Sequence, residues 1–146
     1  MKTSRVTSGT PWEQHFGYAR AVRRGAFAAV SGTVASDASG QPLGGDAYEQ
    51  TRAILRHIGE ALVLLGGAGL SEVVRLRVLF ADAGIAEGFR RALEEVFPAG
   101  APALTAQRVV ALVDPAYLLE IEADAILSPE PLARRDEDVP GDEQAD

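Results

Sequence analysis

Three carboxylates stand at alternate positions in the segment LLEIEADAI: Glu120, Glu122 and Asp124. Successive side chains of a β-strand point to opposite faces, so these acids would share one face of a strand. Two carboxylates spaced in this way could contact one substrate and exchange protons with it. They could instead form cross-strand ion pairs with Arg75 and Arg77, which have the same spacing in SEVVRLRVLFAD. Both interpretations stay open, and the ion pairs are the simpler one.

Few other side chains in the sequence could carry chemistry. Tyr18, in GYARAV, could donate its hydroxyl group to a ligand or simply pack its ring. His15 and His57 are far apart and belong to no metal-binding motif, and the absence of cysteine excludes thiol nucleophiles and thiolate metal sites. Ser31 has no recognisable base partner, and no glycine-rich segment has the spacing of a phosphate-binding loop. Neither a metal nor a cofactor is therefore expected.

The net charge of −7 is unevenly distributed along the 146 residues. From Ser128 onward, seven acidic residues stand against two arginines, so residues 1–127 carry a net charge of about −2. This predicts a single domain over residues 1–127 and an acidic, disordered tail over 128–146. The basic residues are scattered, which argues against nucleic acid as a partner. The sequence shows no signal peptide and no apolar run of membrane-spanning length, so a cytoplasmic protein with no membrane partner is expected.

The elements that would position these residues follow from the spacing of apolar side chains. RAVRRGAFAAVSGTVA predicts a hairpin with strands over 21–23 and 26–34. Asp46 as N-cap and Glu49 as the third helical residue predict the start of a helix that ends at Gly66. One face of this helix would be buried, through Ile54, Leu55, Ile58, Ala61, Leu62 and Leu65.

The second half of the chain predicts a strand, a shorter helix and two more strands. In the first of these strands, Val74, Leu76, Val78 and Phe80 would share one face, and Arg75, Arg77 and Leu79 the other. The helix is expected over 85–97, followed by a strand in PALTAQRVVALVDP and the strand LLEIEADAI. This order predicts an α+β fold with helices on one face of a mixed sheet. The other face would have to be buried against a second subunit.

Five segments, in the same order and spacing, resemble the RidA/YjgF family between about residues 16 and 127. They are GYARAVRRGAFAAVSGT, GGDAYEQTRAIL, GAGLSEVVRLRVLFAD, PALTAQRVVAL and LLEIEADAI. The resemblance implies a chorismate-mutase-like fold, assembled as a homotrimer whose sheets form a central barrel with a ligand cleft at each subunit interface. It also implies hydrolysis of imines or enamines of amino acids without metal or cofactor.

The resemblance assigns roles to individual residues. Glu120 and Tyr18 would be catalytic because they hold the attacking water, and Ser31 and Gly32 would bind the substrate. The family's carboxylate-binding arginine falls on Leu104, and Arg20 replaces the glutamine near the tyrosine. The resemblance places Leu104, Thr105 and Arg20 with Ser31 and Gly32 among the substrate-binding residues. Leucine cannot replace a guanidinium in binding a carboxylate.

The missing arginine leaves two explanations. Arg20, Arg90, Arg91 or Arg108 could reach the cleft from another direction, or the ligand is not a 2-imino acid; we favour the second explanation. The chain is thus expected to hydrolyse or tautomerise a small imine, enamine or related carbonyl compound. The alternatives are a small-molecule-binding or chaperone-like trimer without catalysis and, less favoured, an endoribonuclease or translation inhibitor.

Overall fold

The computed structural model describes residues 1–129. Apart from Ser128 and Pro129, the predicted acidic tail lies outside the described residues. The elements are β1 (Thr3–Val6), α1 (Pro11–Phe16), β2 (Ala21–Arg24), β3 (Phe27–Thr33), α2 (Ala47–Leu64), β4 (Val73–Phe80), α3 (Ala86–Val96), β5 (Ala103–Arg108) and β6 (Leu119–Ile126). Across the described residues, none of the helices has the length and apolarity needed to cross a membrane.

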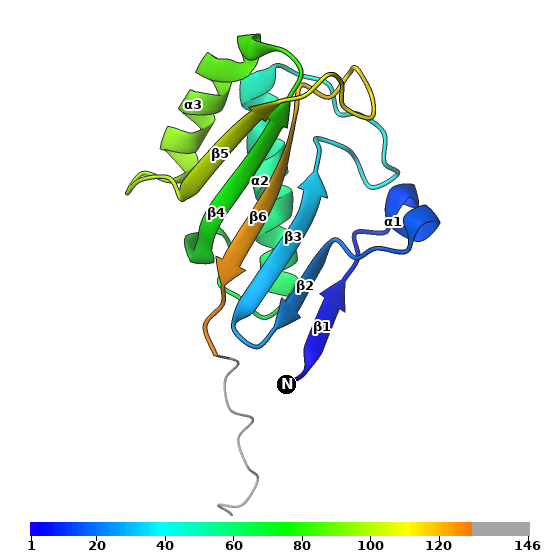
Figure 1. Ribbon diagram of the computed structural model, residues 1–146, viewed down its shortest axis with the longest axis vertical. Helices are drawn as coiled ribbons and strands as arrows, with labels where there is room; N and C mark the ends of the chain where they lie inside the picture. The colour runs from blue at the N-terminus through cyan, green and yellow to red at the C-terminus, as the bar shows by residue number, and fades with distance from the viewer. Residues whose placement is uncertain (130–146) are drawn as a thin grey trace, which may run out of the picture.

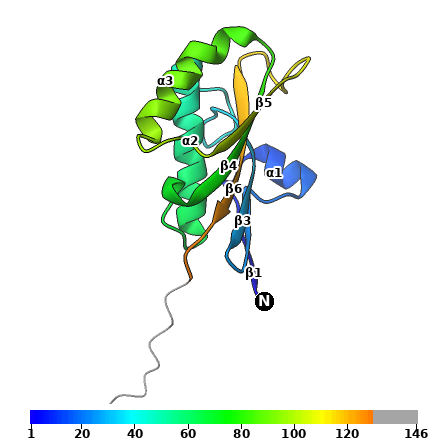
Figure 2. The same cartoon turned by 60° about the vertical axis from the view of Figure 1, so that its left-hand side comes forward.

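One six-stranded mixed sheet forms the centre of the molecule, with the strand order β1-β2-β3-β6-β4-β5. Strands β4 and β5 are parallel, and the other neighbours are antiparallel. Helices α2 and α3 lie together on one face, as Figures 1 and 2 show. The predicted α+β fold is confirmed, whereas β1 and α1, which contains His15, were not predicted.

The long helix begins and packs as the sequence predicts. The Asp46 carboxylate accepts a hydrogen bond from the backbone N–H of Glu49, and the Glu49 carboxylate accepts one from the N–H of Asp46. This capping box satisfies backbone donors that have no partner within the helix. All six residues of the predicted apolar stripe are buried. Burial of this stripe against β3 and β6 fixes α2 on the sheet.

Two strand predictions were wrong in detail. Val74 is 47% exposed and Val73 is buried in its place, because the register of β4 against β6 shifts between Val73 and Arg75. Such a β-bulge moves side chains from one face to the other, and period-two spacing alone does not reveal it. The strand expected in PALTAQRVVALVDP ends at Arg108, well before Pro115.

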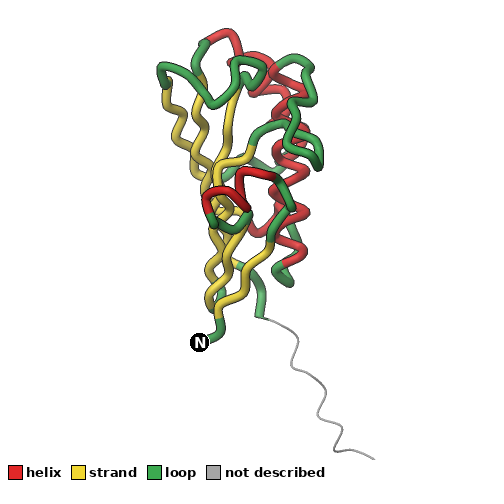
Figure 3. Tube along the Cα trace, turned by 90° about the vertical axis from the view of Figure 1, so that its right-hand side faces the viewer, coloured by secondary structure: helices red, strands yellow, loops and turns green. Residues whose placement is uncertain are grey.

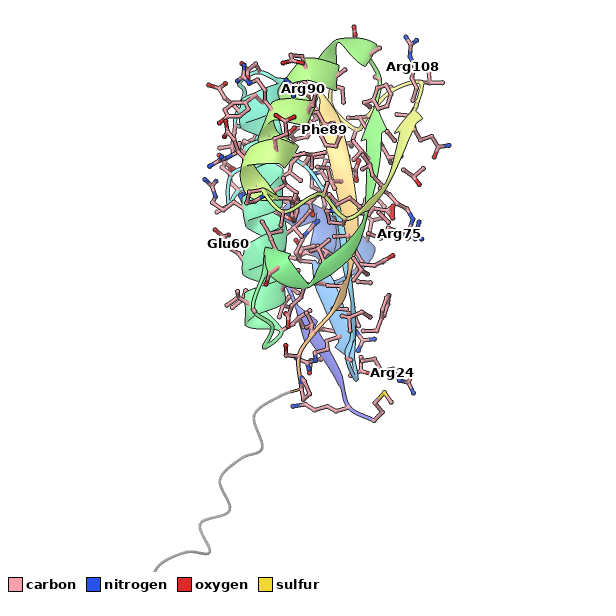
Figure 4. All side chains as sticks on the ribbon, turned by 90° about the vertical axis from the view of Figure 1, so that its left-hand side faces the viewer. Arg24, Glu60, Arg75, Phe89, Arg90 and Arg108 are labelled. Atoms are coloured by element: carbon pink, nitrogen blue, oxygen red, sulfur yellow. The ribbon has the colours of Figure 1, made fainter. Side chains whose placement is uncertain are left out.

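The acids of β6 share the face that α2 and α3 leave open, as their alternation predicts. The predicted pairing of this row of acids with Arg75 and Arg77 is confirmed for Asp124 and wrong for Glu120 and Glu122. Arg75 and Arg77 both direct their guanidinium groups to Asp124, at 4.0 Å and 3.2 Å. Figure 4 shows Arg75 pointing away from the helices. Asp124 therefore takes the ion pairs, while Glu120 stands opposite the apolar Leu79.

Helix α3 packs so closely on the start of α2 that only glycine fits at position 88. A Cβ atom there would lie 2.7 Å from the backbone nitrogen of Tyr48. We expect Gly88→Ala to lower the free energy of unfolding by about 1–3 kcal/mol, because backbone cannot move aside as a side chain can. Chemical denaturation measures this.

Gly59→Ala is the matched control, since a Cβ atom at Gly59 would approach only the Leu70 side chain, at 3.1 Å. Alanine also favours the helix by up to about 1 kcal/mol over glycine. Equal stability of the two variants would contradict the close approach at Gly88.

Candidate functional site

A cavity of about 690 Å³ lies between the segment containing α1, the end of β3, α2 and Glu120 of β6. Figure 3 views the molecule from the side that carries α1, with the strands on the left and α2 on the right. Four of the residues predicted for the site line this cavity: Tyr18, Arg20, Gly32 and Glu120. Its volume is in the range of small-molecule sites.

Arg20 holds the end of β3 in an irregular conformation. The register between β3 and β6 shifts between Val30 and Thr33, which marks a β-bulge. The Nη1 of Arg20 donates to the carbonyl oxygen of Gly32 at 2.6 Å and to the Thr33 hydroxyl at 3.1 Å. The guanidinium therefore satisfies backbone and side-chain acceptors that the bulge turns away from the sheet.

The positive charge of Arg20 has a buried partner in Glu13. Arg20 Nη2 lies 3.3 Å from Glu13 Oε2, and both side chains are almost fully buried. The Thr10 hydroxyl donates to Glu13 at 2.7 Å, and Ser8 donates through both its N–H and its hydroxyl. Burial alone would raise the pKa of Glu13, but these hydrogen bonds and Arg20 together lower it below its usual value of 4.5. Glu13 is therefore ionised at neutral pH.

None of the four arginines considered as replacements for the missing one is available in this cavity. Arg20 is committed to Glu13 and to the bulge. Arg90 pairs with two glutamates of its own helix, and Arg91 stacks over the Tyr48 ring at 4.4 Å. Arg108 donates to the carbonyl oxygen of Ala81 and, like Arg90, lies elsewhere in the molecule (Figure 4). Within residues 1–129, none of these four arginines is thus free to bind a ligand carboxylate in this cavity.

Glu120 has the properties of a proton acceptor. Its carboxylate packs so tightly on Gly32 that a Cβ atom on that residue would overlap it. Burial raises the pKa of Glu120 above 4.5, Arg20 lowers it, and the neighbouring Glu122 raises it further. No hydrogen bond or ion pair within residues 1–129 occupies this carboxylate. A carboxylate with a raised pKa in a cavity is suited to general base catalysis.

Tyr18 and Ser31 flank this group with different orientations. Tyr18 is 36% exposed at the cavity, and Arg20 lies over its ring at 5.7 Å from the centroid. The Ser31 hydroxyl donates to the carbonyl oxygen of Ala19 at 2.8 Å and does not line the cavity. The tyrosine can therefore meet a ligand, whereas the serine hydroxyl supports the loop before β2.

Leu104 and Thr105 lie apart from this cavity on the edge strand β5. Leu104 stands beside Leu76, on the face that the helices cover, and Thr105 stands beside Arg77, on the open face. Strand β4 separates both from β6. Because Leu104 and Glu120 lie on different strands and opposite faces, one chain alone cannot bring them to one ligand.

Sequence reasoning missed the contributions of α1 and α2 to the cavity. Trp12 and Phe16 come from α1, and His57 comes from α2. Glu13, also in α1, does not line the cavity but binds Arg20, which does. Burial, followed by the charge of Arg56, lowers the pKa of His57, so it is neutral at pH 7. The signal for α1 was present: TPWE has proline at the first helical position and Glu13 three residues after Thr10.

The cavity offers oxygen, amide and imidazole groups but no metal-binding cluster. Among the described residues, no three histidine, aspartate or glutamate side chains come close enough to hold an ion. The arrangement brings a carboxylate with a raised pKa and a tyrosine to one cavity, and both kinds of group can exchange protons with a ligand.

Comparisons with known proteins agree with this fold. Residues 12–127 match the family model described as endoribonuclease L-PSP. The chain is 36% identical over 121 residues to the uncharacterized protein SCO2049 of Streptomyces coelicolor, covering 83% of this chain and 90% of that protein.

Two solved structures extend this agreement to three dimensions. A YjgF/YER057c/UK114 family member from Mycobacterium tuberculosis superposes with a TM-score of 0.77 at 36% identity, over 86% of this chain and all of the other. The yeast protein Mmf1, at 22% identity, shares the fold with a TM-score of 0.76 over 87% of this chain and 100% of its own. The matched motifs and these comparisons show that the chain belongs to the YjgF/RidA (endoribonuclease L-PSP) family.

Proposed function

We propose that this protein hydrolyses a small imine or enamine, or tautomerises a related carbonyl compound, without a metal, at a cleft completed by a second subunit. The observation that carries the proposal is the Glu120 carboxylate, which has a raised pKa and lies on Gly32 in a cavity shared with Tyr18. The family of the chain supports the same class of reaction.

For an imine, the reaction follows from the groups at hand. Glu120 accepts a proton from water as the water oxygen bonds to the carbon of the C=N group. The nitrogen takes up a proton to give a carbinolamine, with the Tyr18 hydroxyl near enough to the cavity to serve as donor. Glu120 then returns its proton to the nitrogen while the carbinolamine hydroxyl gives a proton back to Tyr18, so that the C–N bond breaks, ammonia leaves and a carbonyl compound remains. Water and the imine supply all the atoms of the products.

Leu104 argues against a 2-imino acid as the substrate. A carboxylate in a water-poor cleft needs a paired cation, and leucine supplies neither charge nor a donor. Arg20 does not replace it, because its guanidinium is paired with Glu13 and donates to Gly32 and Thr33. The substrate is therefore a compound without a carboxylate next to the reacting carbon.

Glu120→Gln tests the catalytic role of the carboxylate. We expect the rate of imine hydrolysis to fall by a factor of about 100 or more, the usual contribution of a positioned general base. In the unchanged protein, kcat/KM should fall as the pH is lowered through the raised pKa of Glu120, since only the ionised form accepts a proton. Steady-state ammonia release measures both the rate of the variant and the pH dependence of kcat/KM in the unchanged protein.

Glu122→Gln is the matched control, because Glu122 lies on the same face of β6, two residues away. It should leave the rate within a factor of about 3, since Glu122 does not line the cavity. Hydrolysis at the unchanged rate in Glu120→Gln would refute the mechanism.

The alternative is a trimer that binds a small molecule without catalysis, and Leu104 is the observation that favours it. Leu104→Arg separates the two functions in an assay of ammonia release. The two substrates compared are the imine of a 2-amino acid and the imine of a simple amine. If the unchanged protein is an enzyme, it releases ammonia from the second compound, and the variant gains at least tenfold on the first. Activity confined to the variant would support loss of catalysis and refute the enzymatic proposal.

The proposed trimer rests on the open face of the sheet. Phe27 and Ile126 stand opposite each other on this face and are 48% and 51% exposed. Apolar side chains on a sheet face without helices indicate burial against another subunit. Subunit contact is also the one way to bring Leu104 of one chain to Glu120 of another.

Light scattering should therefore give three times the chain mass of 15.4 kDa. Phe27→Lys should yield smaller species, because it places a charge in the contact. Val63→Lys, on the exposed side of α2, should leave the mass unchanged. A monomer in the unchanged protein would contradict the shared cleft.

The nuclease activity in the family's description is the less favoured function. Phosphate binding requires unpaired basic side chains, and the cavity lining contains three carboxylates and two arginines, Arg20 and Arg56, each with an acidic partner.

A further inference from the structure

The outer part of the cavity is apolar and aromatic. Trp12 and Phe16 lie one turn apart on α1 with their rings almost parallel, at an interplanar angle of 5° and 6.4 Å between centroids. Leu43, Leu64 and Val113 come from three other segments and line the same cavity, each at least half exposed. Exposed apolar side chains gathered around a concave surface indicate a site for an apolar group.

The aromatic pair is held at a defined place relative to Glu120. Glu13 follows Trp12 on α1, and its ion pair with Arg20 ties the helix to the carbonyl oxygen of Gly32. The Glu120 carboxylate packs on the same Gly32. Buried contacts thus connect the aromatic pair, which would bind an apolar group, with Glu120, which would accept a proton.

The charges around the cavity disfavour an anionic ligand. Asp37, Glu60 and Glu120 line it, against Arg20 and Arg56. Arg20 is paired with Glu13, and Arg56 Nε lies 3.7 Å from Glu60. His57 does not add a positive charge at pH 7, because burial lowers its pKa. A carboxylate entering here would lose its hydration without gaining a free cation among the described residues.

We infer that the cavity binds an aryl-substituted ligand without a carboxylate, with its ring against Trp12 and Phe16 and its C=O or C=N carbon near Glu120. The inference rests on the proposed function for the place of the reacting carbon, but binding itself requires no turnover. The cavity of about 690 Å³ has room for a phenyl ring with a three-carbon chain.

Phenylacetone and phenylpyruvate form a matched pair of probes, because both carry a benzyl group on a ketone and only the second has a carboxylate. Ligand-observed NMR with the full chain should show phenylacetone binding at least tenfold more tightly than phenylpyruvate. Phenylacetone should also bind at least tenfold more tightly than acetone, which lacks the ring. Trp12 is the sole tryptophan, so its fluorescence should change with the same concentration dependence.

Variants of α1 locate the ring. Phe16→Ala should weaken phenylacetone binding at least fivefold, and Phe16→Leu, which keeps the apolar volume if alanine disturbs α1, should weaken it less. Tyr48→Ala removes an aromatic side chain outside the cavity and should leave binding unchanged.

Three results would overturn the inference: equal or tighter binding of phenylpyruvate, no detectable binding of phenylacetone, or unchanged affinity in both Phe16 variants. These outcomes are independent of the catalytic proposal. If Glu120→Gln kept full activity, the mechanism would fail while the binding result stood.

Discussion

The buried ion pair between Arg20 and Glu13 is the interaction on which the site depends. Two charges with little solvent contact are costly unless hydrogen bonds satisfy their remaining donors and acceptors. Here Ser8 and Thr10 donate to the carboxylate, while the guanidinium donates to Gly32 and to Thr33 beside it. This network joins α1, the residue before β2 and the bulge of β3, and each of these segments contributes to the lining of the cavity. Loss of either charge would leave the other buried and unpaired.

The same network explains why similar carboxylates on β6 behave differently. Asp124 meets Arg75 and Arg77 across the sheet and is neutralised by them. Glu120 lies four residues away on the same face, but there the bulge allows it to pack on glycine backbone and burial raises its pKa. The bulge thus separates a structural acid from one suited to proton transfer, and it uses the arginine that could otherwise have bound a ligand carboxylate.

Charge and shape at the cavity point to the same kind of ligand. The two arginines that line the cavity have acidic partners. At the position where the family has a carboxylate-binding arginine, this chain has Leu104, which lies on the edge strand β5 away from the cavity. Helix α1 contributes two aromatic rings to the same cavity. The proposed assembly connects these features, since only a neighbouring chain could bring Leu104 to Glu120.

The sequence by itself determined helices α2 and α3, the capping box at Asp46, the faces of β6 and the family, because these depend on local spacing and on the order of motifs. Tertiary structure decided which partners the charges take. Asp124, and not Glu122, forms the ion pairs with the arginines of β4, and Arg20 forms one with Glu13. Val73 is buried in the core where Val74 was expected. These outcomes depend on bulges and strand register, which shift side chains by one position between faces, and period-two spacing carries no signal for such shifts.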